Sequence, residues 1–133
     1  MNDAGLTLLK QFEGFRGDPY KDAGGVLTVG YGTTFPLDEV EASMLLGSRV
    51  GIMEAAVREL VTVPLSENQW AALTSLVYNI GQTAFRDSTL LERINAQDWT
   101  AVPTEWRRWV KAGKKTLPGL VARREDELKL WFA

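Results

Sequence analysis

The spacing of apolar residues predicts a short helix at the start of the chain. From Leu6 to Phe12 apolar side chains recur at intervals of three, which is close to the helical period. Asn2 or Asp3 can cap the N-terminus of this helix, and Gly14 is expected to end it. Glu13 is therefore placed at the C-terminal end of the predicted helix.

The pattern changes over residues 14–35, where several glycines surround the β-rich run VLTVGY. Strand-forming residues between glycine-rich stretches are typical of a hairpin. We predict a small antiparallel β-hairpin here, with Ala23-Gly24-Gly25 near its turn.

From Leu37 onward the pattern is helical almost to the end. Asp38 with Glu41 resembles a capping box, which predicts a helix through Leu46, followed by a longer amphipathic helix to about Val61. These are the first two helices of a predicted helical lobe at about 37–133.

Three further helix boundaries carry capping signals. Ser66 with Gln69 forms a second capping box, which opens an apolar helix that Gly81 can end. Ser88 caps the next helix. Beyond these lie a short helix after Pro103, the loop AGKKTLPG and a final helix of about 118–132. The predicted fold class is α+β, with an N-terminal helix and a small hairpin followed by a mainly helical bundle.

Length and composition indicate one globular domain. The chain has 133 residues, 45% of them hydrophobic and 24% charged. It contains neither cysteine nor histidine, which excludes disulfides, cysteine-based metal sites and histidine-based triads. An enzyme built on this chain works with carboxylates, hydroxyls, amides, Lys or Arg, and neither a metal nor a cofactor is expected.

The net charge of −2 is unevenly distributed. Residues 103–133 hold eight Lys and Arg against four Asp and Glu. This basic region either faces an anionic polymer or is a solvated helical face.

No apolar stretch approaches the ~18–20 residues that span a bilayer. The first residues, MNDAGLTLLKQFEG, do not resemble a signal peptide. The protein is therefore expected to accumulate in the cytoplasm of the cell that makes it.

Two carboxylates bracket the predicted hairpin, and a hydroxyl follows its turn. Glu13, Asp22 and Thr28 are separated by eight and five residues. Such a trio also arises by coincidence near glycine-rich turns. In a chain without His or Cys, however, no other plausible catalytic set stands out.

Glu13, Asp22 and Thr28, followed by TVGYGT from Thr28 onward, resemble the phage-type lysozyme family, the muramidases that bacteriophages use as endolysins. LSENQWAALTSLVYNIGQTAFRDSTLLERINAQDW is similar to the central helix of that family and the turn after it. EWRRWVKAGKKTLPGLVARREDELKLW is similar to its C-terminal signature. The resemblance implies a single lysozyme-like catalytic domain over 1–133, with a β-lobe at about 14–35.

The resemblance implies hydrolysis of the β-1,4 bond between N-acetylmuramic acid and N-acetylglucosamine in bacterial peptidoglycan. A partly desolvated carboxylic acid can protonate the glycosidic oxygen, and Glu13, at the end of an apolar helix, suits this role. Asp22, in a polar turn, is expected to stay ionised and activate water that Thr28 holds. This arrangement predicts inversion of the anomeric centre.

The family also implies candidate substrate contacts. Tyr31 and Thr34 either line the cleft or pack within the hairpin. Tyr78 and Asn79 end the central helix, where the family places cleft contacts, although Asn79 is equally suited to ending the helix before Gly81.

Other polar and aromatic residues have two interpretations each. Ser88 is expected to act as an N-cap rather than a sugar contact. Arg123 and Arg124 either contact a catalytic carboxylate or lie on a solvated face, and they are left out of the catalytic set. Trp106, Trp109 and Trp131 occur at helical spacing with apolar neighbours, which favours core packing over sugar stacking.

The chain departs from the family pattern in two places. Thr33 stands where many members carry His, which removes a structural ion pair, and the segment between Thr34 and Asp38 is short. The shortened segment affects the sugar subsites and leaves the catalytic trio intact.

Two alternative functions were considered. A lytic transglycosylase cuts the same bond but needs neither Asp22 nor Thr28 in this arrangement. A helical module that binds nucleic acid through the basic C-terminal region is opposed by the negative net charge, so no nucleic-acid binding is expected. The expected partners are peptidoglycan and a holin, whose pores release a monomeric enzyme from the host cytoplasm to the periplasm and cell wall.

Overall fold

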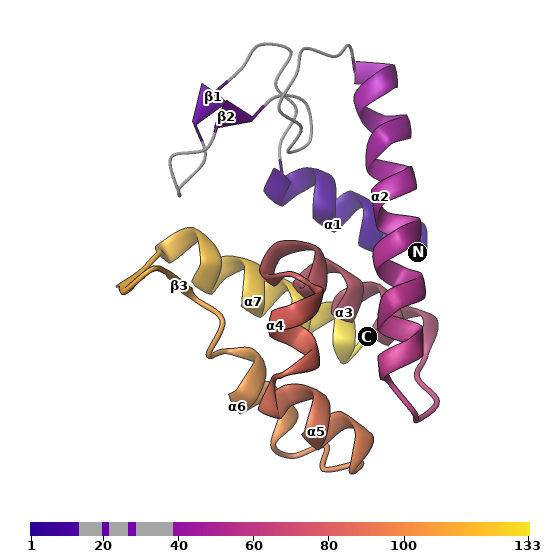
Figure 1. The fold of residues 1–133 in the computed structure, drawn as a ribbon, viewed down its shortest axis with the longest axis vertical. Coiled ribbons are helices and arrows are strands. Elements are labelled where there is room, and N and C mark those ends of the chain that lie inside the picture. Colours follow the sequence, from indigo (N-terminus) through magenta and orange to yellow (C-terminus); the bar gives the residue numbers. More distant parts are fainter. Residues whose placement is uncertain (14–19, 22–26, 29–38) are drawn as a thin grey trace.

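The computed structural model describes the backbone of residues 1–13, 20–21, 27–28 and 39–133, and the side chains of residues 1–13 and 46–133. Seven helices and four short strands lie in these ranges (Figure 1). The helices are α1 (Asp3–Glu13), α2 (Glu39–Leu60), α3 (Glu67–Ile80), α4 (Gln82–Arg86), α5 (Thr89–Asn95), α6 (Val102–Trp106) and α7 (Pro118–Trp131). The strands are β1 (Tyr20–Lys21), β2 (Leu27–Thr28), β3 (Lys111–Ala112) and β4 (Lys115–Thr116).

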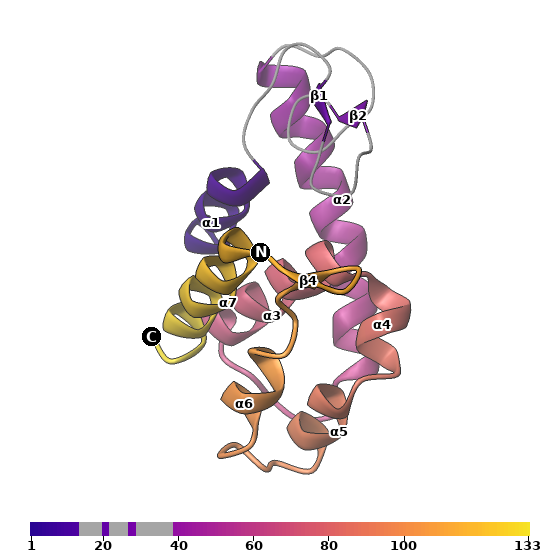
Figure 2. The same cartoon turned by 90° about the vertical axis from the view of Figure 1, so that its left-hand side faces the viewer.

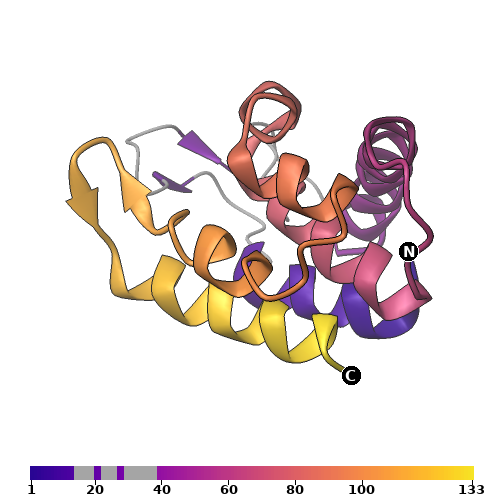
Figure 3. The ribbon, with the colours of Figure 1, turned by 90° about the horizontal axis from the view of Figure 1, so that it is seen from below.

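The central element is α3, against which α1, α2 and α7 pack (Figure 2). Every residue from Trp70 to Val77 is buried, so this helix is surrounded by protein on all sides, as expected for a helix that is apolar around its circumference. Figure 3 shows α1 and α7 side by side on the same side of the molecule. The end of α1 is thereby brought next to α7.

The predicted caps of α3 and α5 are confirmed. Ser66 Oγ accepts from the Gln69 backbone N–H (3.1 Å), and Gln69 Oε1 accepts from the Ser66 backbone N–H (2.9 Å). Gly81 ends α3 at φ 95°, a backbone conformation that glycine adopts readily, and its N–H donates to the Val77 carbonyl. Ser88 caps α5 through the Leu91 N–H.

The predicted break near Leu46 is wrong, because α2 is one continuous helix. Leu46, Val50 and Val57 fall on one face of the helix and are almost fully buried. Gly47 and Gly51 lie on the exposed side, where each costs the helix only ~1 kcal/mol relative to alanine. Burial of the continuous apolar face outweighs this local penalty.

Two antiparallel strand pairs are present. In β1–β2, Tyr20 pairs with Thr28 and Lys21 with Leu27, within the region predicted to form a hairpin. The predicted turn at Ala23-Gly24-Gly25 lies outside the described residues. The segment predicted as a plain loop, AGKKTLPG, instead contains β3–β4, joined by a turn that begins at Gly113 with φ 62°. Glycine is favoured at the first position of such a two-residue turn.

The predicted core role of the tryptophans is confirmed. Trp106 and Trp131 are buried and meet edge to face, with ring centroids 5.3 Å apart. Trp109 is partly buried against the same core. A smaller apolar cluster of Leu9, Leu46 and Val50 joins α1 to α2.

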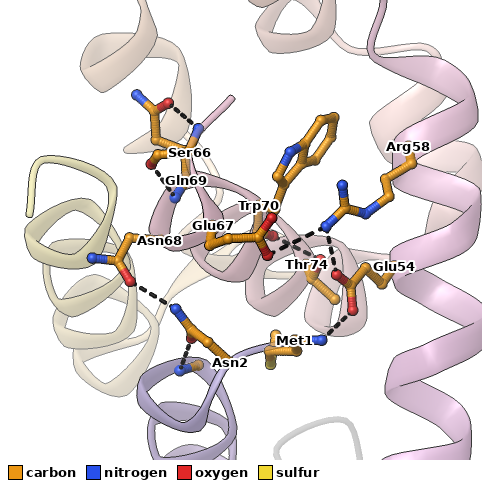
Figure 4. Close-up of polar contacts among 11 residues, drawn as sticks. Met1, Asn2, Glu54, Arg58, Ser66, Glu67, Asn68, Gln69, Trp70 and Thr74 are labelled. Carbon is orange, nitrogen blue, oxygen red and sulfur yellow. Dashed lines mark hydrogen bonds and ion pairs between the residues drawn. The ribbon is translucent and has the colours of Figure 1, made fainter. Parts of the chain in front are cut away.

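Polar contacts also fix the start of α1 (Figure 4). The Met1 ammonium pairs with Glu54, which also accepts from Arg58 Nη2 at 2.9 Å. Asn2 Oδ1 accepts from the Gly5 N–H (2.9 Å), so Asn2 is the capping residue of the two proposed. Asn2 Nδ2 also donates to Asn68 Oδ1 in α3 (2.7 Å). The N-terminal end of α1 is therefore tied to α2 and α3.

None of the helices in the described ranges combines the length and the apolar character needed to cross a bilayer.

Candidate active site

Glu13 is the last residue of α1, as the sequence predicts. Buried Leu8 and Leu9 hold the helix against the rest of the molecule. The Glu13 side chain is 18% exposed, and its Oε1 accepts from Arg123 Nη1 in α7 at 2.9 Å. The candidate acid is therefore partly withdrawn from water and held by a charged partner.

Arg123 lies beneath Glu13 and has only 5% of its side chain exposed. Its Nη2 donates to the Ser75 carbonyl (3.2 Å), and its Nε donates to Glu127 Oε2 (3.3 Å). The guanidinium carbon lies 5.5 Å from the centroid of the Phe12 ring. Of the two roles considered for this arginine, the structure shows contact with the candidate catalytic carboxylate.

Glu127 is fully buried and is a polar residue that the sequence analysis did not identify. It accepts from Ser75 Oγ (2.6 Å) and from Trp106 Nε1 (3.1 Å). Both neighbouring arginines of α7 also pair with it. The spacing Arg-Arg-x-x-Glu was a usable signal, since residues three and four apart on a helix face one another.

Arg124 is buried beside Glu127. Its Nη2 donates to Glu127 Oε2 (3.2 Å), and its Nη1 donates to the Trp109 carbonyl (2.9 Å). Its Nε lies 2.7 Å from Glu127 Oε1 without a hydrogen bond of acceptable geometry. Burial lowers the pKa of the Arg124 guanidinium, against the opposing attraction of Glu127. Arg124 therefore belongs to the buried ion cluster rather than to a solvated face.

Tyr78, a candidate substrate contact, shares the electrostatic environment of Glu13. Burial raises the pKa of the Tyr78 phenol, and the negative charge of Glu13 acts in the same direction. A hydrogen bond from Arg49 of α2 acts the opposite way. The ring also packs against the small apolar cluster between α1 and α2. The structure therefore brings Tyr78 together with Glu13 and Arg123.

The remaining candidate site residues are described by the structure only in part. Asn79 is exposed, one residue before the end of α3. Thr28 lies in β2 with its backbone paired to Tyr20, while its side chain is outside the described part of the chain. Asp22, Tyr31 and Thr34 lie outside the described residues.

Ser88 acts as a cap in the way the sequence indicates. Its Oγ accepts from the Leu91 N–H (3.1 Å) and donates to the Phe85 carbonyl (2.6 Å). The residue is also at the edge of an open pocket of about 400 Å³, whose lining includes Glu105, Arg108 and Trp109.

Within the described ranges no group of three or more acidic, His or Cys residues could hold a metal ion.

The chain is similar to known proteins over nearly its whole length. A family model described as phage lysozyme matches residues 10–127. The endolysin of Acyrthosiphon pisum secondary endosymbiont phage 1 is 38% identical over 98% of this chain and 97% of its own. The SAR-endolysin of Escherichia phage Mu is 41% identical over 85% of this chain and 70% of its own. A crystal structure of a P22 lysozyme mutant superposes with a TM-score of 0.84 at 33% identity, covering 100% of this chain and 98% of that one.

The fold and these similarities define a lysozyme-like peptidoglycan glycosidase. The chain belongs to the phage lysozyme family, as the match over residues 10–127 shows.

Proposed function

We propose that this protein is an endolysin that hydrolyses the β-1,4 bond between N-acetylmuramic acid and N-acetylglucosamine in host peptidoglycan. Glu13 is the general acid that protonates the leaving oxygen. Asp22 is the general base, and Thr28 holds the water that Asp22 activates. Water attacks the sugar directly, and the anomeric centre is inverted.

The observation that carries this proposal is the position of Glu13. Glu13 is at the end of a helix, its side chain is only 18% exposed, and its carboxyl group lies 2.9 Å from Nη1 of a buried arginine, Arg123. A general acid must be held in a fixed position relative to the atom it protonates. Contacts at both ends of α1, at Met1 and Asn2 and at Glu13, support such a fixed position.

The remaining roles rest on the sequence and the family. Asp22 and Thr28 follow Glu13 at the spacing that resembles the family motif. Tyr78, whose phenol is close enough to be influenced by the charge of Glu13, is proposed as a sugar contact together with Asn79 at the end of α3. Tyr31 and Thr34 are proposed to line the opposite wall of the cleft.

The decisive test is Glu13→Gln, assayed by turbidity on Gram-negative cells stripped of their outer membrane. An amide cannot donate the required proton, so activity should fall by ~10²–10⁴-fold while the circular dichroism spectrum is unchanged. Glu59→Gln is the matched control, because Glu59 is exposed on α2 and should retain full activity. Retention of more than about a tenth of wild-type activity by Glu13→Gln would remove Glu13 from the acid role.

The products of the digestion separate hydrolysis from the transglycosylase reaction. Hydrolysis adds water and leaves a free reducing end on N-acetylmuramic acid, whereas a transglycosylase leaves an anhydro sugar. Mass spectrometry of the muropeptides should show reducing ends only.

We further propose that a holin releases the enzyme from the host cytoplasm to the cell wall. The matched relatives include both endolysins and SAR-endolysins, so membership of the family does not decide the route.

A further inference from the structure

We infer that Glu127 is a positioning residue for the catalytic acid: it orients Arg123 against Glu13 and offsets the positive charge of Arg123 and Arg124. The inference rests on the proposed role of Glu13 as general acid.

Glu127 is held from three helices at once. Its Oε2 accepts from Ser75 Oγ of α3 (2.6 Å) and from Arg123 Nε of α7 (3.3 Å), and its Oε1 accepts from Trp106 Nε1 of α6 (3.1 Å). The side chain has no exposed surface. A carboxylate fixed in this way has one orientation, and the arginine bonded to it is fixed as well.

Arg123 transmits this orientation to Glu13. Each of its three nitrogens has its own acceptor: Glu127 for Nε, the Ser75 carbonyl for Nη2 and Glu13 for Nη1. Because a guanidinium is planar and its donors point in set directions, fixing two of them sets the direction of the third. The Nη1 donor then defines where the Glu13 carboxyl lies.

The charges of the cluster explain why a second carboxylate is needed. Arg123 and Arg124 are both almost completely buried, with 5% and 1% of their side chains exposed. Buried positive charge that is not offset opposes the action of a neighbouring carboxyl group as an acid. Glu127 contributes one negative charge to the cluster, so Arg123, Arg124 and Glu127 together carry one positive charge instead of two.

The other described groups around Glu13 do not supply this compensation. Tyr78 of α3 faces it as a neutral phenol, whose pKa burial raises. Arg49 of α2 and Lys10 of α1, three residues before Glu13, bring positive charge. The negative charge that shares Arg123 with Glu13 is that of Glu127.

Stability alone is a weak reason for such a cluster. Buried ion groups can often be replaced by apolar side chains of similar volume without loss of stability. This cluster extends from the core to Glu13, and apolar side chains in its place could not orient the Glu13 carboxyl group.

The test is Glu127→Gln, which keeps the shape of the side chain and removes its charge. The alkaline limb of the pH–activity profile should move to lower pH, because the positive charge of the arginines is then no longer offset by Glu127. The loss should be in kcat rather than in KM. Glu125→Gln is the matched control, since it removes the same charge from the exposed side of α7 and should leave the profile unchanged.

A neutral control separates charge from packing. Ser75→Ala removes one hydrogen bond to Glu127 and no charge, so it should lower stability without moving the alkaline limb. If Glu127→Gln does not fold, Arg124→Gln is measured in its place. This variant removes a positive charge from the same cluster instead of a negative one, so it should move the alkaline limb of the pH–activity profile to higher pH.

A folded Glu127→Gln, or a folded Arg124→Gln in its place, with a wild-type pH profile would overturn the inference. That failure is distinct from failure of the proposed function, which would appear as an active Glu13→Gln.

Discussion

Arg123 donates from Nη1 to Oε1 of Glu13 over 2.9 Å and so connects two residues that are 110 positions apart in the chain. The contact exists because α1 and α7 both pack against α3 and lie next to each other. The arginine is thereby part of the environment of the proposed acid, and its removal affects both the fold and the chemistry.

Arg123→Lys should reduce kcat by roughly 10–100-fold, the range expected when a reacting group is displaced. One ammonium group cannot replace three guanidinium donors that point to Glu13, Glu127 and the Ser75 carbonyl. Steady-state kinetics on soluble peptidoglycan fragments measure the effect. Arg107→Lys, in an exposed pair with Glu125, is the control and should be without effect on kcat. Equal kcat values for both variants would contradict the positioning role.

Thr28→Val should slow catalysis more than it weakens substrate binding. In the proposed single displacement the two carboxyl groups are separated by roughly 6.5–9.5 Å, which leaves room for the water that Thr28 holds. Valine keeps the shape of threonine but cannot bind that water.

Proton NMR of the first sugar released should show the α-anomer, and an initially β product would refute direct attack by water.

Ser88→Ala should lower stability by about 1 kcal/mol with KM unchanged, because the hydroxyl serves as the N-cap of α5. Thermal unfolding and steady-state kinetics are measured together. Thr89→Ala changes the exposed neighbour and is the reference for a substitution without a capping role. A raised KM at unchanged melting temperature would assign Ser88 to sugar binding instead.

Gly5→Ala should destabilise the protein by about 1–3 kcal/mol, the usual cost of overpacking. A Cβ at this position would lie 2.6 Å from Met1 Cγ and 2.8 Å from Ala71 Cβ, where α1 meets α3. Gly51→Ala is the opposite case, since nothing lies within 4 Å of the added atom. It should stabilise α2 by about 0.5–1 kcal/mol. Urea unfolding measures the expected loss of stability in Gly5→Ala and the expected gain in Gly51→Ala.

Expression of this chain in a bacterial host should cause prompt lysis only when a holin is expressed with it. Turbidity of the two cultures after induction measures the difference, and expression of Glu13→Gln with the holin shows how much of the lysis requires the enzyme. Prompt lysis by the chain alone, with the inner membrane intact, would show another route of release.

Local interactions explain which helix boundaries were predictable. The caps at Ser66 and Ser88 and the end at Gly81 depend on bonds between residues three or four positions apart, which the sequence displays directly. The continuity of α2 was not predictable in this way. It depends on Leu46 and Val50 being buried against α1, a long-range contact that overrides two helix glycines.

For the candidate site, the sequence by itself determined the type of chemistry. A chain without His or Cys works with carboxylates, hydroxyls, amides, Lys or Arg, and the local pattern around Glu13 placed one carboxylate at the end of a helix. Only the tertiary structure decided what surrounds that carboxylate. Arg123 meets Glu13 because α1 and α7 both pack against α3, and the spacing of residues along the chain does not show this contact between residues 110 positions apart.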